Sequence, residues 1–124
     1  MSILLVVLVI SCGPPPPAPT PTPVKVTSRA LFQHYFDDEV SAEYEYQGKV
    51  SEMTGEIRKK TKKEGVYEIS LEGDGVIGEV VCKVSALNVR AAEAKIGRVA
   101  TVRGRVIGVP GCVNVVVQPC TVLD

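Results

Sequence analysis

Four cysteines and a single histidine, His34, are the side chains of this chain best suited to nucleophilic or metal chemistry. A cysteine nucleophile needs a histidine in contact with it and a third group that orients the histidine. The cysteines are not spaced as zinc ligands are, and the chain has no glycine-rich phosphate loop. The sequence therefore predicts neither an enzyme nor a bound metal or cofactor, and it places His34 on a helix surface.

Cys12 has a different chemistry, because it closely follows an unbroken apolar run over residues 3–10. The run is too short to span a bilayer, which takes about 20 apolar residues, but it suits the core of a secretory signal. Val9-Ile10-Ser11-Cys12 resembles the lipobox at which bacterial lipoproteins are cut and acylated. We therefore expect residues 1–11 to be a signal peptide and Cys12 to be the lipidated N-terminus. The alternative, a buried strand that ends in Ser-Cys, fits poorly with the prolines that follow.

Residues 13–23 read GPPPPAPTPTP, in which the prolines prevent both helix and sheet. Such a segment adopts extended polyproline II at about 3.1 Å per residue, which predicts a semi-rigid stalk of roughly 30–35 Å. A ligand for a proline-binding domain is the alternative, and the stalk is favoured. We assign residues 12–26 to the lipidated cysteine and stalk, and residues 27–124 to one folded domain.

An acylated Cys12 would hold the protein in the cell envelope, since two or more acyl chains give a stable membrane anchor. Gly13 takes the position at which an aspartate favours retention in the inner membrane of enteric bacteria. The resemblance to a lipobox thus implies the outer membrane, facing the periplasm, for a Gram-negative source.

A basic cluster between the first two predicted strands is the other feature that could bind a ligand. It comprises Arg58, Lys59, Lys60, Lys62 and Lys63. Contact with phosphate, a lipid headgroup or another anion is one interpretation, and a solvated hairpin tip is the favoured one. Acidic and basic residues balance at 14 each, and the predicted second and third strands offer one aromatic side chain, Tyr67. Because single-stranded nucleic acid binds through aromatic stacking platforms, nucleic acid is not an expected partner.

The elements that would position these residues begin with a helix. Thr27 or Ser28 can cap it, and it should run to about Val40. Its apolar stripe, at helical spacing, consists of Leu31, Phe32, Tyr35 and Phe36. The acidic run of residues 37–39 could hold a cation, but consecutive helix residues point in different directions, so a solvated helix end is favoured.

Five segments then have the composition of strands, and a short helical segment over residues 86–95 separates the third from the fourth. Gly55 lies inside the first segment, where it predicts a bulge or a sharp bend. The predicted strands cover residues 49–60, 65–72, 76–85, 98–108 and 112–123. This order predicts a mainly β fold: a five-stranded OB-fold-like Greek-key barrel with an N-terminal helix and a helix between strands three and four.

Several short motifs of the domain resemble those of one family. They are Ala42-Glu43-Tyr44, Tyr46-Gln47-Gly48-Lys49, Thr54-Gly55-Glu56-Ile57, Val81-Cys82, Gly97 with Thr101-Val102-Arg103-Gly104, and Cys120. On these motifs, residues 28–124 look like the tRNA-anti-like OB-fold family of predicted bacterial lipoproteins. The resemblance implies the barrel fold and carries over no ligand site. The chain departs from the family pattern at Asp37-Asp38 and by its extra Cys112.

With Cys12 assigned to lipid, three cysteines remain for an oxidising compartment: Cys82, Cys112 and Cys120. Cys112 and Cys120 lie at opposite ends of one predicted strand, roughly 26 Å apart, whereas a disulfide needs Cα atoms within about 7 Å. The family resemblance implies cysteines at positions 82 and 120, and both lie late in predicted strands, so a Cys82–Cys120 disulfide is predicted. Three small buried thiols are the alternative.

Taken together, these features predict a lipid-anchored envelope protein with a non-catalytic OB-fold domain for binding or interaction. Its expected partners are the membrane, through the lipid, and an envelope protein or a small or oligomeric ligand. Two alternatives remain open: an exclusion or immunity lipoprotein of the phage or plasmid type, and a periplasmic module that binds an oligosaccharide or another small ligand.

Overall fold

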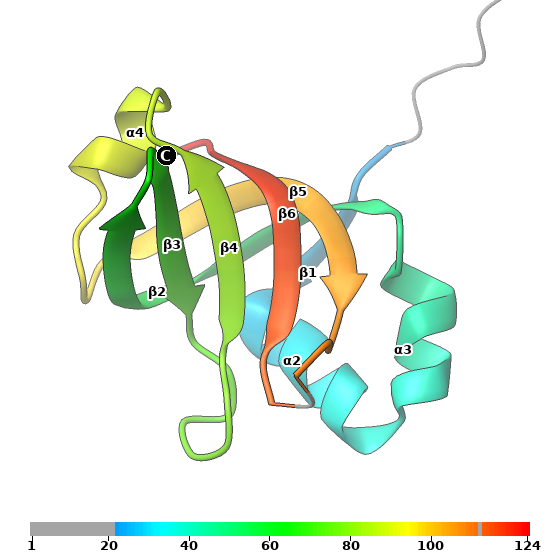
Figure 1. The fold of residues 1–124 in the computed structure, drawn as a ribbon. Coiled ribbons are helices and arrows are strands. Elements are labelled where there is room, and N and C mark those ends of the chain that lie inside the picture. Colours follow the sequence, from blue (N-terminus) through cyan, green and yellow to red (C-terminus); the bar gives the residue numbers. More distant parts are fainter. Residues whose placement is uncertain (1–21, 112) are drawn as a thin grey trace, which may run out of the picture.

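A computed structural model of the chain describes residues 22–111 and 113–124, so the predicted signal peptide, Cys12, most of the predicted stalk and Cys112 lie outside the described residues. The elements, in chain order (Figure 1), are β1 (Val24–Thr27), α2 (Ser28–Asp37), α3 (Glu39–Tyr46), β2 (Val50–Lys63), β3 (Val66–Leu71), β4 (Val80–Ser85), α4 (Val89–Glu93), β5 (Val99–Gly108) and β6 (Val115–Val122).

Strands β2 to β6 close into a barrel. The strand order is β1-β2-β3-β4-β6-β5, and β2 also pairs with β5. The first half of the 14-residue strand β2 pairs with β5 and its second half with β3, so one long strand serves two neighbours. Strand β4 pairs in parallel with β6, whereas the other pairings within the barrel are antiparallel. This topology, with α4 between β4 and β5, confirms the predicted OB-fold.

Strand β1 was not predicted, and it crosses the expected boundary between stalk and domain at residues 26 and 27. It pairs in parallel with the start of β2, from Val24 opposite Ser51 to Thr27 opposite Thr54. Val24 and Val26 are partly buried against the core, while Lys25 is exposed. This period of two is that of a half-buried strand, so the chain enters the barrel already paired to β2.

The single helix expected to reach Val40 is instead two helices that meet at Asp38. The Asp38 carboxylate accepts a hydrogen bond from the backbone N–H of Ser41 at 3.1 Å and so caps α3. The N-terminal end of a helix, where N–H groups are unpaired, favours acidic side chains, which explains the positions of Asp38 and Glu39 at the start of α3. His34 joins the two helices, since its Nε2 lies 3.0 Å from the Ser41 hydroxyl.

Gly55 is required by close packing, whereas the bulge expected there lies elsewhere. The register of β2 against β3 shifts between Ile57 and Lys59. A Cβ atom on Gly55 would collide with the Ser28 hydroxyl, which donates a hydrogen bond of 2.7 Å to the backbone carbonyl of Glu72. Glycine at position 55 thus lets the start of α2 lie directly on the barrel.

The core fills the barrel and extends beneath α2. Its largest fully buried side chains are Leu31, Met53, Ile57, Ile69, Leu71, Val80, Val84, Val102, Val106, Val115 and Val117. Within the described residues, the helices are all too short or too polar to cross a membrane.

Candidate functional site

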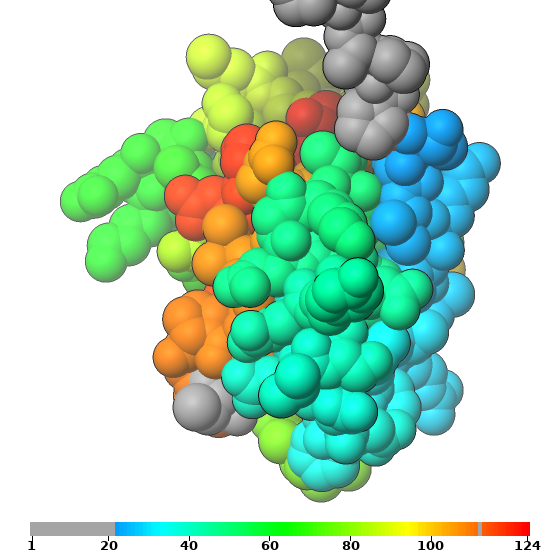
Figure 2. Space-filling model, turned by 90° about the vertical axis from the view of Figure 1, so that its right-hand side faces the viewer, coloured from blue at the N-terminus to red at the C-terminus, as the bar shows by residue number. Residues whose placement is uncertain are grey.

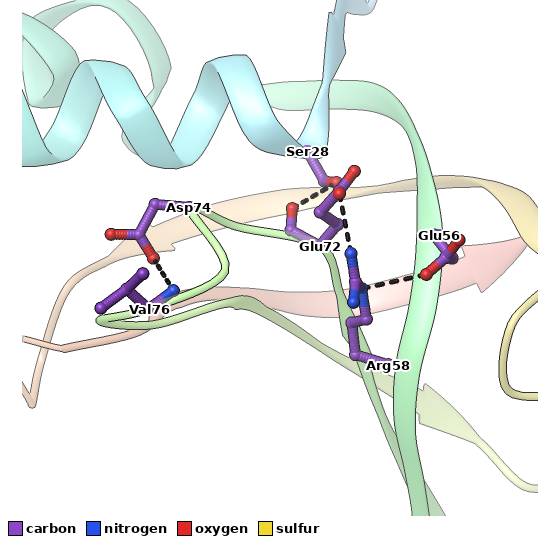
Figure 3. Close-up of polar contacts among 6 residues, drawn as sticks. All are labelled: Ser28, Glu56, Arg58, Glu72, Asp74 and Val76. Carbon is purple, nitrogen blue, oxygen red and sulfur yellow. Dashed lines mark hydrogen bonds and ion pairs between the residues drawn. The ribbon is translucent and has the colours of Figure 1, made fainter.

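The structure does not bring the five cations of the predicted basic cluster together on one surface. Arg58 lies at one end of the cluster, where its guanidinium pairs with Glu56 at 3.1 Å and with Glu72 at 2.8 Å (Figure 3). Lys59 lies 4.0 Å from the carboxylate of Glu79. Ion pairs as exposed as these contribute little to stability, about 0–1 kcal/mol, but they leave this end of β2 without excess positive charge.

The other lysines of the cluster have different surroundings. Lys60 Nζ donates to the carbonyls of Ala92 and Ala94, both at 2.8 Å, and so satisfies the end of α4. It also lies 4.8 Å from the centre of the Tyr67 ring, and Lys62 lies 5.6 Å from it. Lys63 is exposed at the end of β2. Anion binding by the whole cluster therefore stays a prediction without a shared surface to support it.

Replacing Lys60 with alanine should destabilise the domain by about 1–2 kcal/mol, because two charge-assisted hydrogen bonds to helix carbonyls and a cation–π contact are lost. The matched variant Lys63→Ala should change the free energy of unfolding by less than about 0.5 kcal/mol, as exposed substitutions usually do. Denaturant unfolding of both variants measures the difference. Equal effects would show that Lys60 does not support α4.

A groove lies at one end of the barrel, between the β3–β4 loop (residues 72–79) and the described residues 109–111 and 113–114 of the β5–β6 loop. Its volume is about 360 Å³, and Arg58, Glu72, Ile77, Glu79 and Asn114 are among the residues that line it. In Figure 1 both loops lie at the lower end of the barrel, close to α2, whereas β1 begins at the upper end. The groove therefore faces away from the point at which the chain enters the domain.

Asp74 holds the β3–β4 loop in shape. Its Oδ1 accepts backbone N–H bonds from Val76 at 2.9 Å, Ile77 at 2.8 Å and Gly78 at 3.3 Å. The first of these bonds is drawn in Figure 3. Because these N–H groups bond to the carboxylate, they cannot extend the sheet. The strand predicted from residue 76 consequently begins only at Val80.

The two loops of the groove are joined by hydrogen bonds. The side-chain oxygen of Asn114 accepts from the backbone N–H of Glu79 at 2.9 Å, and the N–H of Val115 donates to the Glu79 carbonyl at 3.1 Å. Gly78 lies so close to the Val113 carbonyl that a Cβ atom would collide with it. The walls of the groove are therefore preformed, as is usual for binding sites.

Loop stability should depend on the ionisation of Asp74. The hydrogen bond from the Val76 N–H lowers the pKa of this carboxyl below its ordinary value, and those from Ile77 and Gly78 lower it further. Desolvation raises the pKa, but by less than the hydrogen bonds lower it. Because the pKa is lower in the folded protein than in the unfolded chain, the ionised carboxylate stabilises the fold at pH values above about 3.9, the ordinary pKa. This contribution is lost as the pH falls through the lowered pKa of the folded state. The wild-type protein should therefore have a higher thermal unfolding midpoint than Asp74→Asn at pH 7. The difference between the two midpoints should become smaller below about pH 4. A gap independent of pH would contradict this role.

A smaller cavity of about 160 Å³ adjoins the groove and lies between α2 and the β5–β6 loop. Ile77 and Val113 line both hollows. The remaining lining residues of the small cavity are Phe32, Tyr35, Phe36, Glu39, Val109 and Val115. Figure 2 shows the helical surface beside it, where α2 and α3 cover this side of the molecule and the orange segment around β5 and its following loop lies next to them.

Tyr35 is the polar group of this cavity that needs explanation. Its side chain is 4% exposed, and its hydroxyl has no hydrogen-bond partner within the described residues. Burial, together with the nearby carboxylates of Glu43 and Glu39, raises the pKa of Tyr35 to about 12, so the phenol is a hydrogen-bond donor at neutral pH. A buried polar group without a partner is costly, and native proteins contain few of them.

The described strands offer little for nucleic acid. On β3, Glu68 is exposed whereas Ile69, Ser70 and Leu71 are buried, and the outward residues of β4 include Lys83. Tyr67 is the aromatic residue expected in this region, and its ring is already in contact with the ammonium groups of Lys60 and Lys62. Over residues 22–111 and 113–124, no group of His, Cys, Asp and Glu side chains is arranged to hold a metal ion.

Cys82 and Cys120 lie on the neighbouring parallel strands β4 and β6, and both are buried inside the barrel. Both are thiols, and Cys120 Sγ donates to the Val117 carbonyl at 3.1 Å. The hydrogen bond with Cys120, followed by burial, raises the pKa of the Cys82 thiol well above its ordinary value. The predicted disulfide therefore remains a prediction, now between two adjacent strands.

Comparison with known proteins agrees with this architecture. The tRNA_anti-like family matches residues 16–121. The chain belongs to this family. A candidate nucleic acid-binding lipoprotein from Klebsiella pneumoniae has a similar crystal structure, with a TM-score of 0.68 and 17% identity over 82% of this chain and 92% of that one. No curated protein matches the chain.

A second solved structure with partial similarity is the Stn1–Ten1 complex of S. pombe, at a TM-score of 0.45 and 18% identity over 60% of this chain and 58% of that one. The Klebsiella structure supports the barrel fold of this tRNA_anti-like protein, and the yeast complex adds nothing to it. Sequence reasoning found the family but missed the groove. The one available signal is Asp74 within Glu72-Gly73-Asp74-Gly75, a sequence that by itself is typical of a turn.

Proposed function

We propose that this tRNA_anti-like protein is a lipid-anchored envelope protein whose OB-fold domain binds a partner or ligand and catalyses no reaction. The observation that carries the proposal is the preformed groove at the end of the barrel, where the charged side chains pair with one another. Arg58, for example, is held between two carboxylates and is not free to activate a substrate.

The anchoring part of the proposal rests on the lipobox-like Val9-Ile10-Ser11-Cys12 and the proline-rich segment after it. It is supported by the position of β1, which lets a chain arriving from a membrane enter the barrel at the end remote from the groove (Figure 1). Such an arrangement would present the groove to the surroundings of the membrane. Because Gly13, and not an aspartate, follows Cys12, the outer membrane facing the periplasm is the proposed location for a Gram-negative source.

Protein or peptide partners fit the groove better than nucleic acid does. Phosphate backbones bind to unpaired lysines and arginines, whereas the cations beside the groove lie close to Glu56, Glu72 and Glu79. Bases stack on exposed aromatic rings, and the outward residues of β3 supply none. The nucleic acid binding named for the Klebsiella protein is accordingly the weaker candidate for this chain.

Two measurements on the native chain test the proposal. Intact-mass spectrometry of protein extracted from membranes should show loss of residues 1–11 and an acylated Cys12; a chain with Met1 intact and no acyl mass would disprove anchoring. Crosslinking in native membranes should then join a partner to residues of the 72–79 or 109–114 loops. Crosslinks confined to the hairpin at Lys63 would contradict the groove as the binding site.

A further inference from the structure

The surface beside the small cavity is strongly acidic, although the chain as a whole has no net charge. Helices α2 and α3, residues 28–46, contain one basic residue, Arg29, and five acidic ones: Asp37, Asp38, Glu39, Glu43 and Glu45. The ion pairs among the described residues involve none of these five carboxylates. Their charge is therefore available to a cationic partner.

Exposed apolar side chains lie next to this charge. Phe36 on α2, Ile77 on the β3–β4 loop and Val113 on the β5–β6 loop line the small cavity and are 56%, 47% and 46% exposed. Val40 and Tyr44, one turn apart on α3, are also largely exposed. Large apolar side chains gathered at one site and surrounded by charge are typical of interaction surfaces.

Tyr35 forms part of the inner wall of the cavity and is almost fully buried. Its hydroxyl oxygen is closed off from solvent, so a bound side chain would pack against the aromatic ring. The cavity is of suitable size for one side chain, because an apolar cavity of about 150 Å³ accommodates a benzene molecule.

We propose that this cavity and the acidic surface of α2 and α3 bind a cationic peptide segment of a second protein, which inserts one aromatic or branched aliphatic side chain beside Tyr35 and places lysine or arginine against Glu39 and its acidic neighbours. The inference rests on the proposed function of the domain as a binding module, and it specifies the partner. Charge complementarity decides the occupant, since anionic lipid and the uncharged segment of residues 13–23 offer no cation to these carboxylates.

The test uses the full chain purified in detergent and three fluorescein-labelled synthetic peptides at low salt. The first has the sequence Lys-Arg-Phe-Leu-Arg-Lys, the second replaces its cations with acidic residues, and the third replaces Phe-Leu with Ser-Gly. Fluorescence anisotropy should show that the first peptide binds at least about tenfold more tightly than either of the others. Hydrogen exchange should show protection of residues 28–46 and 109–115.

Two variants separate recognition from folding. Phe36→Ala should weaken binding of the first peptide by roughly 3- to 10-fold, because the cavity loses an exposed apolar wall, while the unfolding midpoint changes little because this side chain is 56% exposed. Glu39→Gln should weaken binding and reduce its salt dependence. Glu68→Gln, an exposed carboxylate on β3, is the matched control and should leave binding unchanged.

Equal affinity for the cationic and acidic peptides, or unchanged affinity in Phe36→Ala, would overturn the proposal. So would saturation of the cavity by a synthetic copy of residues 13–23, by anionic phospholipid vesicles, or by a second copy of the chain in sedimentation experiments. These outcomes are independent of the acyl mass at Cys12, so a failure of anchoring and a failure of peptide recognition can be told apart.

Discussion

Replacing Cys12 with alanine is expected to move the protein completely from the membrane fraction to the soluble or unprocessed fractions. The thiol of Cys12 is the predicted attachment point of the acyl chains, and without two or more such chains membrane binding is marginal and reversible. Fractionation followed by immunoblotting measures the change, and the mobility of the band reports whether residues 1–11 have been removed.

Cys112→Ala is the matched control for this experiment, because it also removes one cysteine but leaves the lipobox-like sequence intact. It should fractionate with the membrane as the wild type does. If Cys12→Ala also remains membrane-bound and is processed normally, anchoring through this residue is wrong, and the envelope address inferred from it loses its support.

Anchoring at the N-terminus would have a geometric consequence, because the point of entry and the groove lie at opposite ends of the barrel (Figure 1). The chain enters through β1, which is paired along its length with β2. Strand β1 leads directly into α2, whose Ser28 hydroxyl binds the carbonyl of Glu72 at the groove. A short, hydrogen-bonded path thus connects the entry point to the site, which would keep the groove oriented away from an anchoring surface.

The barrel was predictable because its strands carry their own signals. In β3, Ile69 and Leu71 alternate with Glu68 and Ser70, and in the structure the first pair is fully buried. Alternation of this kind depends only on neighbouring residues. The order of strands and helix then restricts the topology to a few possibilities, of which the OB-fold is the one observed.

The features that sequence reasoning missed depend on contacts between distant residues or on competing local bonds. Asp38 interrupts the predicted helix because its carboxylate caps the next one. Asp74 delays β4 because it takes three N–H groups that a strand would use. Gly55 is explained by the approach of Ser28, which precedes it by 27 positions and comes from another element.

The candidate site was less predictable than the fold for the same reason. Consecutive residues of β2 point to different sides, so a run such as Arg58 to Lys63 that looks like one cluster is divided among ion pairs, a helix end and solvent. Tyr35 looks like an ordinary core residue of an apolar stripe. Its spacing in the stripe does not reveal that the hydroxyl is buried without a hydrogen-bond partner among the described residues.

Reduction of the native protein is expected to lower its stability by about 3–4 kcal/mol if Cys82 and Cys120 form the predicted disulfide. The bond would close a loop of about 38 residues, and restricting such a loop in the unfolded chain accounts for this amount in the chain-entropy model. The structure places the two cysteines on adjacent strands, with Val84 opposite Cys120 in the register. Unfolding midpoints with and without a thiol reductant measure the difference.

The pair should form its bond during folding, by exchange with the disulfide of an envelope oxidoreductase, which leaves that enzyme as a dithiol. Once the barrel has closed, Cys82 is fully buried and its pKa is raised by the Cys120 hydrogen bond and by burial, so little thiolate is available for attack. Alkylation in denaturant before and after reduction should reveal two additional thiols. Cys112→Ser should retain the effect of the reductant, whereas Cys120→Ser should abolish it. Full alkylation of Cys82 and Cys120 without reduction would show that the barrel contains two thiols, and its stability would then come from packing alone.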